Sequence, residues 1–159
     1  MRMVAIVTFV LAGLVSHLSA QSTAQQVASA FTKHKDVVKE KNGVRMEKYK
    51  DVHSEPTLRQ RVQDYAGVYE VPDMGYRITI QVGTDGTISA YRDNSKLENA
   101  RIDGAVLTAK GFEGVFLTRT DRDSPSDPGT VMYGLGVVLR TPIEFNGNTY
   151  DKLFYQLKQ

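Results

Sequence analysis

Residues 64–92, DYAGVYEVPDMGYRITIQVGTDGTISAYR, contain the pattern that decides the fold. From residue 76 to residue 83, apolar and polar side chains alternate, which is the period of a strand with one face in a core. A Thr-Asp-Gly turn follows, and residues 87–93 alternate again. The stretch therefore predicts an antiparallel hairpin that buries one of its faces.

The length of the loop sets the register of this hairpin. A two-residue loop would place Val82 opposite Ser89, whereas a three-residue loop places Val82 opposite Ile88. The longer loop keeps apolar residues together. It also gives Gly86 the left-handed conformation that closes a type I turn with a G1 bulge. We therefore predict the three-residue loop.

The rest of the chain from residue 65 predicts a meander of short antiparallel strands. The predicted strands cover residues 65–71, 76–83, 87–93, 97–102, 105–110, 112–120, 130–140 and 149–157, with a short piece at 143–146. Closure of such a meander leaves no open edge. We predict an all-β fold, an antiparallel meander closing into a small lipocalin-like barrel of about eight strands with an N-terminal helix. A flat sandwich is the alternative.

Turn residues and glycines add detail to this meander. Asp103-Gly104 and Asn146-Gly147 each predict a two-residue turn, the first pairing residue 102 with residue 105. The polar segment 121–129, DRDSPSDPG, predicts a surface loop. Gly134 and Gly136 interrupt the longest strand, which indicates a bend or the close approach of another element.

Residues 1–20 have the layout of a secretory signal. A short basic start precedes an apolar run over 4–15, which is too short for a comfortable membrane span. We expect cleavage after Ala20 and a secreted or periplasmic protein, with uncleaved anchoring as the alternative.

Between the signal and the barrel, we expect a helix and a basic linker over residues 21–53, with the barrel domain over 54–159. Residues 22–41 carry a thin apolar stripe of helical period. Residues 44–53 could form a charged edge strand or an extended linker, of which we expect the linker. A short helix over 54–65 then leads into the first strand. The residues of the stripe are Ala24, Val27, Ala28, Phe31 and Val38.

Composition excludes several functional classes. The 159 residues suit one domain and carry a net charge of +2, which recommends neither nucleic acid nor membrane as a partner. Nine basic and five acidic residues gather in 33–61, where a solvated helix and linker is the simplest interpretation. Because cysteine is absent, disulfides, thiol catalysis and thiolate metal sites are excluded.

The run EPTLRQRVQDYAGVYEVP, residues 55–72, resembles the start of the small lipocalin-like domain of unknown function found C-terminal to serine beta-lactamase-type hydrolases. The resemblance covers residues 55–92, and the hydrolase motifs Ser-x-x-Lys and Gly-x-Ser-x-Gly are missing from this sequence. Gly67-x-Tyr69 is more distantly similar to the Gly-x-Trp of lipocalins, although this chain has no tryptophan. That resemblance implies a structural barrel base of Gly67, Tyr69 and Arg140, with the Arg140 cation over the Tyr69 ring.

Catalytic and metal chemistry find little support in the sequence. His34 and His53 follow the signal, both lie outside the predicted barrel, and we expect them to be exposed. Asp121, Asp123 and Asp127 could supply oxygens to calcium but lack the spacing of an EF-hand loop. We therefore predict no catalytic residue, no metal site and no cofactor.

Eight tyrosines give the strongest functional signal. A tyrosine suits a cavity wall because its ring is apolar and its hydroxyl can fix a ligand, although aromatic residues on strands are usually core residues. The candidate ligand contacts on predicted strands are Tyr69, Tyr76, Tyr91, Tyr133 and Tyr155.

These patterns predict a secreted or periplasmic, non-enzymatic barrel that binds a small apolar ligand or a partner protein, and that has no membrane span after signal cleavage. One alternative is a small enzyme, a hydrolase or isomerase, using tyrosine and carboxylate groups at the barrel mouth. Another is a structural or interaction module that docks its basic residues 33–61 on an acidic surface.

Overall fold

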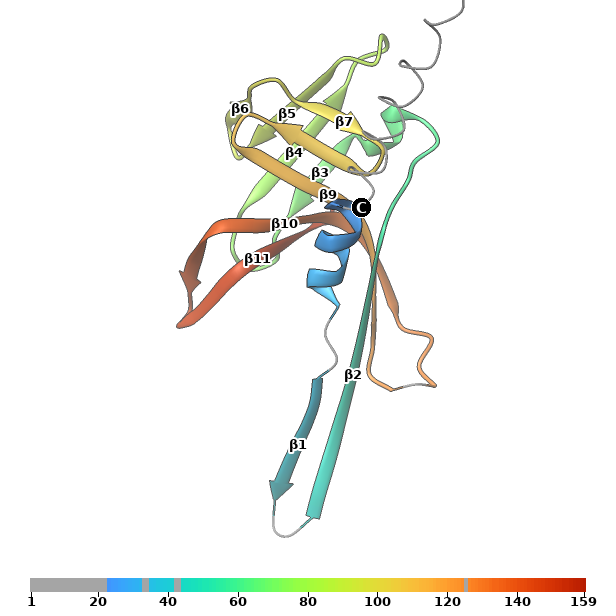
Figure 1. Cartoon of the computed structure of the whole chain (residues 1–159), viewed down its shortest axis with the longest axis vertical. Coiled ribbons are helices and arrows are strands. Elements are labelled where there is room, and N and C mark those ends of the chain that lie inside the picture. The colour runs from blue at the N-terminus through green and yellow to red at the C-terminus, as the bar shows by residue number, and fades with distance from the viewer. Residues whose placement is uncertain (1–22, 33–34, 42–43, 125) are drawn as a thin grey trace, which may run out of the picture.

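The computed structural model describes residues 23–32, 35–41, 44–124 and 126–159. These residues form an eleven-stranded antiparallel sheet that curls into a barrel-like body, with a helix over residues 23–31 (Figure 1). The predicted all-β, barrel-like fold is confirmed. The elements are β1 (Lys35–Lys41), β2 (Val44–Pro56), the 3-10 helix η1 (Val62–Tyr65), β3 (Gly67–Glu70), β4 (Arg77–Val82), β5 (Ile88–Arg92), β6 (Ser95–Leu97), β7 (Arg101–Asp103), β8 (Val106–Ala109), β9 (Phe112–Arg122), β10 (Thr130–Phe145) and β11 (Asn148–Leu157).

Strands β3 to β11 wrap around one core and meet at two narrow junctions. β11 pairs with β3 at two positions, Gln156 opposite Glu70 and Leu157 opposite Tyr69. The other junction joins the ends of β6 and β8. There, the backbone N–H of Lys110, just after β8, donates to the carbonyl oxygen of Glu98, just after β6, over 2.9 Å. The sheet therefore curls around its core and does not lie flat as in the sandwich alternative.

The hairpin of β4 and β5 has the predicted register. Val82 lies opposite Ile88, and the N–H of Gly83 donates to the carbonyl of Thr87 over 2.8 Å. Gly86 has a φ of 84°, in the left-handed region that this loop requires. The prediction of a three-residue loop is confirmed.

Of the other two predicted turns, one is confirmed and one is displaced. Asn146 and Gly147 link β10 to β11, and both have positive φ, 49° and 74°. The turn between β7 and β8 pairs Asp103 with Val106, so its loop residues are 104 and 105 and the predicted register is wrong. Gly104 has a φ of 58°, which matches a type II′ turn with glycine first.

Two predicted strand boundaries also change. The predicted strand 97–102 is divided between β6 and β7, because the chain turns at Asn99, whose φ is 56°. β10 is continuous and includes residues 143–145 of the predicted short piece, whereas Asn146 belongs to the turn that follows. Its register against β11 shifts between Val138 and Ile143, and Pro142 lies in this bulge, where its missing N–H is tolerated.

The core inside the curled sheet is closely packed. Ile78, Ile80, Leu107 and Leu135 are at most 2% exposed, since alternate residues of each strand face inward. The ring of Phe116 packs at a tilt against two tyrosines, Tyr65 and Tyr69, with ring centroids 4.3 and 5.8 Å away.

A second apolar cluster lies under the helix, on the opposite face of the sheet from this core. Ala28 and Phe31 are buried and pack in a cluster with Val115 and Leu117 of β9. Gly136 permits this contact, because a Cβ there would lie only 2.8 Å from the Phe31 ring. The predicted apolar face of the helix is thus confirmed within residues 23–31. The predicted close approach of another element to the longest strand is confirmed at Gly136.

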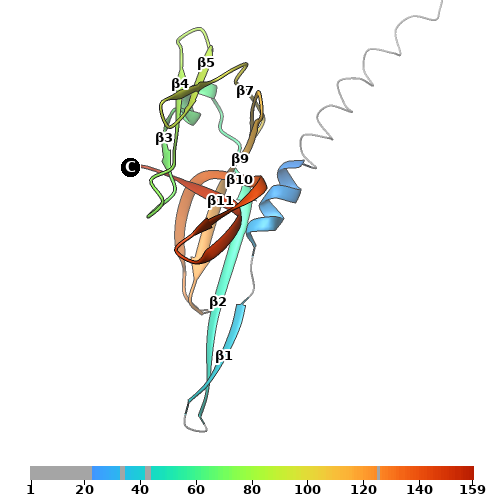
Figure 2. The same cartoon turned by 90° about the vertical axis from the view of Figure 1, so that its left-hand side faces the viewer.

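The segment before the body differs from its prediction. The predicted helix over 22–41 gives way to β1, and the predicted linker over 44–53 is the strand β2. β2 pairs with β1 and then, from Asp51 to Pro56, with β9. The β1–β2 ribbon projects from the body (Figure 2). A charged segment becomes a strand here because partner strands supply its hydrogen bonds.

The predicted boundary between residues 53 and 54 therefore falls inside β2. The predicted short helix over 54–65 is reduced to η1. The predicted signal at residues 1–20 and His34 lie outside the described residues.

Candidate functional site

The turn between β3 and β4 contributes to the walls of two open grooves. The first, which we call the β11 groove, has a volume of about 770 Å³. The second, which we call the clamp groove, has a volume of about 500 Å³. Val71, Pro72 and Asp73 line both. The turn is held by the N–H of Val71, which donates to the carbonyl of Tyr76 over 2.9 Å.

One strand provides an uninterrupted wall of the β11 groove. Residues 148–154 of β11 all line it. The other walls come from the helix, from β2, β9 and β10, and from the β3–β4 turn. Their lining residues are Phe31, Val52, Val71, Pro72, Asp73, Met74, Arg119, Phe145 and Asn146.

Aromatic packing shapes the helix side of this groove. The rings of Phe31 and Phe154 meet at a centroid distance of 6.2 Å. The guanidinium of Arg119 lies 5.6 Å from the Phe154 ring centroid and donates to both carboxylate oxygens of Asp121, at 2.7 and 3.0 Å. Gly134 makes room for the Phe154 ring, which a Cβ would meet at 2.6 Å. Arg119 is therefore held in place by a carboxylate and a ring.

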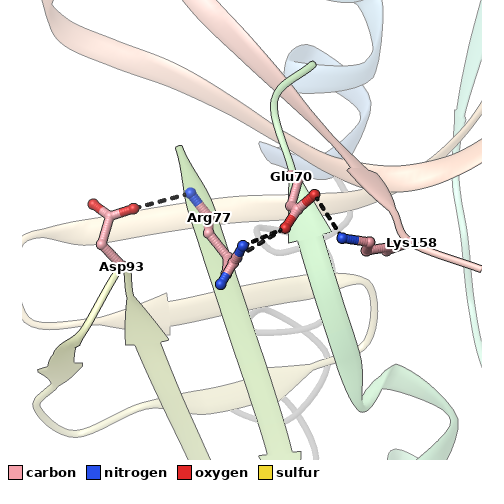
Figure 3. Close-up of polar contacts among 4 residues, drawn as sticks. All are labelled: Glu70, Arg77, Asp93 and Lys158. Carbon is pink, nitrogen blue, oxygen red and sulfur yellow. Dashed lines mark hydrogen bonds and ion pairs between the residues drawn. The ribbon is translucent and has the colours of Figure 1, made fainter. Parts of the chain in front are cut away.

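The clamp groove contains a charged network at the β11–β3 junction (Figure 3). Arg77 Nε donates to one carboxylate oxygen of Glu70 over 2.8 Å, and Lys158 Nζ lies 3.4 Å from the other. The backbone N–H of Arg77 donates to Asp93 Oδ1 over 3.0 Å. This network ties the end of β11 to β3 and β4.

The ionisation of Glu70 follows from these partners. Partial desolvation alone would raise the pKa of Glu70, but hydrogen bonds from Arg77 and the charge of Lys158 outweigh it and lower the pKa. Glu70 is thus a stable carboxylate at neutral pH, which suits an ion pair better than proton transfer.

Two of the five predicted ligand tyrosines lie in the core. Tyr69 and Tyr155 are 2% and 4% exposed. Burial raises the pKa of each to about 12, so both stay protonated at neutral pH. The Tyr69 hydroxyl donates to the carbonyl oxygen of Tyr65 over 2.8 Å. Their position is that of core residues.

The other three predicted tyrosines lie nearer the surface. Tyr76 and Tyr133 are exposed and Tyr91 is half-buried. The Arg59 guanidinium lies 5.0 Å from the Tyr133 ring centroid. All five tyrosines lie outside the residues that line the two grooves.

The predicted barrel base is assembled only in part. Gly67 does allow close approach, since a Cβ there would meet Leu157 Cδ1 at 2.8 Å. Arg140 is exposed on β10, and the ring that contacts Tyr69 is Phe116. The structure therefore does not place Arg140 over Tyr69.

His53 and the acidic loop have local partners. His53 Nε2 lies 2.6 Å from Asp51 Oδ2, with the imidazole half exposed. Asp127 accepts hydrogen bonds from the N–H groups of Asp123 and Gly129, which lower its pKa. Within the described residues, no cluster of three or more acidic or histidine side chains could hold a metal ion.

Sequence patterns did not identify the residues of the β11 groove. Phe145 and Phe154 lie on the two strands of the β10–β11 hairpin, but Phe31 is more than a hundred residues away in the chain, and only folding brings it to the same groove. Two sequence signals did point to this part of the molecule. One was the Asn146-Gly147 turn, which defines the β10–β11 hairpin, and the other was the pair Gly134 and Gly136, which face Phe154 and Phe31.

Comparisons with protein-family models, curated proteins and solved structures found no match to this chain. In the described part of the chain, no helix has the length and apolar character needed to cross a bilayer.

Proposed function

We propose that this protein is an exported, non-enzymatic binding barrel that holds an apolar ligand or a segment of a partner protein in the β11 groove. The observation that carries the proposal is an open groove of about 770 Å³ whose walls combine aromatic and aliphatic side chains with polar ones such as Asp73, Asp151 and Lys152. Small-molecule sites typically occupy about 300 to 1,000 Å³ and are lined mainly by apolar groups.

The packing of the core supports a site outside the barrel. Side chains such as Ile78, Leu107 and Leu135 are at most 2% exposed and occupy the interior. A ligand in the interior would have to displace these residues, whereas the β11 groove is open. The proposed site therefore differs from the interior cavity that a lipocalin resemblance suggests.

Ionisation supports a binding role over the enzymatic alternative. General acid–base groups work best with a pKa near the ambient pH. The pKa of Glu70 is lowered, and burial raises the pKa values of Tyr69 and Tyr155 to about 12. These shifts move each group away from the range that proton transfer needs.

Titration with the uncharged apolar fluorescent dye Nile red tests the proposal. Phe145→Arg places a charge in the groove wall, and we expect it to weaken dye binding at least about tenfold. Val138→Arg is the matched control, because Val138 is 50% exposed on the same strand and lies outside both grooves. Equal dye affinity in the two folded variants would rule out the β11 groove as the site.

Export has its own test. Mass spectrometry of the protein recovered from the medium or the cell envelope should give a mature chain that begins at Gln21, directly after the small residue Ala20. A full-length chain that starts at Met1 in the soluble cytoplasmic fraction would contradict export.

A further inference from the structure

The β11 groove follows an open edge of the sheet. β11 pairs with β10 along most of its length, but on its other edge it meets β3 only at Gln156 and Leu157. Within the described residues, positions 148–155 of β11 have no strand on that second edge. Seven of these eight positions, 148–154, line the groove.

The alternation of an antiparallel strand shows which backbone groups face this edge. The N–H of Lys158 donates to Val68 on the β3 side, over 2.8 Å, whereas the carbonyl of Tyr155 lies against Gly134 of β10. In such a strand, the N–H and C=O of one residue point the same way and alternate along the chain. Lys152 and Phe154 therefore direct their backbone groups into the groove.

We propose that the β11 groove binds an extended peptide segment of a partner protein, which adds to β11 as a further strand. This inference rests on the proposed function and names its ligand class. A wholly apolar ligand would cover backbone donors and acceptors without pairing them, at an energetic cost. A peptide in the β conformation pairs them and places alternate side chains in the apolar walls.

A second copy of this chain fits the edge less well. An isologous pair of β11 strands centred on the open stretch places Lys152 opposite Lys152, or Asp151 opposite Asp151. Like charges directly opposite each other destabilise a sheet. A partner peptide carries no such restriction. The walls formed by Phe31, Phe154 and Met74 favour one with apolar residues at alternate positions.

The test uses the full mature chain and nine-residue peptides selected from a random displayed library. Each residue of a selected peptide is N-methylated in turn, which removes one backbone donor at a time. We expect binding to fall at least about tenfold at alternate positions and to stay within about twofold at the positions between. Loss without this period of two, or no loss at all, would overturn strand addition.

Two variants of one residue provide the protein side of the test. Lys152→Ala removes the side chain and keeps the N–H, and it sets the reference affinity for the peptide. Lys152→Pro also removes the N–H that faces the groove, and we expect it to bind at least about tenfold more weakly than Lys152→Ala. Circular dichroism and the thermal midpoint establish that both variants are folded. Equal affinities in the folded variants would reject the inference.

The outcomes separate this inference from the proposed function. If the dye binds the groove but the library gives no peptide that competes with it, strand addition is wrong and the binding role stands. If neither dye nor peptide binds in a Phe145-dependent way, both fail. A dimer in light scattering that Lys152→Pro converts to a monomer would identify a second copy as the occupant and overturn the partner peptide.

Discussion

The ring of Phe31 in the helix meets the ring of Phe154 in β11 at an interplanar angle of 60°, with centroids 6.2 Å apart. Phe31 also packs over Gly136 of β10. One side chain thus fastens the helix to the sheet and forms part of the β11 groove. Stability and ligand binding should therefore both depend on it.

Phe31→Ala should lower the free energy of unfolding by about 3 kcal/mol, because it removes a buried ring and leaves a cavity beneath the helix. Urea denaturation followed by circular dichroism measures the change. Leu58→Ala is the control, since Leu58 is 72% exposed, and its effect should stay below about 0.5 kcal/mol. Equal small effects of the two substitutions would mean that the helix contributes little to the fold.

Gly86→Ala tests the loop that sets the hairpin register. Gly86 has a φ of 84°, where a Cβ costs about 1 to 2 kcal/mol, so the variant should unfold at a lower urea concentration. Thr84→Ala, at an exposed position of the same loop, should change stability by less than about 0.5 kcal/mol. If Gly86→Ala is as stable as Thr84→Ala, the left-handed position is not required for this turn.

Local signals in the sequence were sufficient to predict the antiparallel meander of the body, although not every turn in it. The alternation around the Thr-Asp-Gly turn gave the register of β4 and β5, because a one-residue slip would have moved apolar residues to the solvent face. The turn between β7 and β8 was displaced by one position, since Asp103-Gly104 and Gly104-Ala105 both suit tight turns and tertiary packing decides between them. The buried Ala105 belongs to the cluster under the helix.

Neither the strand β2 nor the candidate site could be predicted from such local signals. β2 has few apolar residues and takes strand structure from its pairing with β1 and β9, which are distant or ambiguous in the sequence. The tyrosines drew attention as ligand contacts, yet Tyr69 and Tyr155 lie in the core. The open edge of β11 arises because β3 leaves it after two paired positions, a property of the assembled sheet.

Tyr69→Phe distinguishes a core role of this tyrosine from a ligand role. The substitution removes the buried hydrogen bond to the carbonyl of Tyr65, and the free energy of unfolding should fall by about 1 kcal/mol. Dye affinity should stay the same, because Tyr69 lies outside the lining of the β11 groove. A loss of dye binding in a variant that keeps its stability would restore Tyr69 as a ligand contact.

Glu70→Gln tests the charged network at the β11–β3 junction through its pH dependence. Since folding lowers the pKa of Glu70 below its ordinary value of 4.5, the carboxylate contributes stability above that value. The contribution disappears as the pH falls through the lowered folded-state pKa. The wild-type chain should therefore be more stable than Glu70→Gln at pH 7, and the difference should vanish in strong acid.

Urea midpoints across this pH range measure the difference in stability. Glu113→Gln, at an exposed position of β9, is the control. A difference that is independent of pH would mean that Arg77 and Lys158 do not stabilise the ionised form.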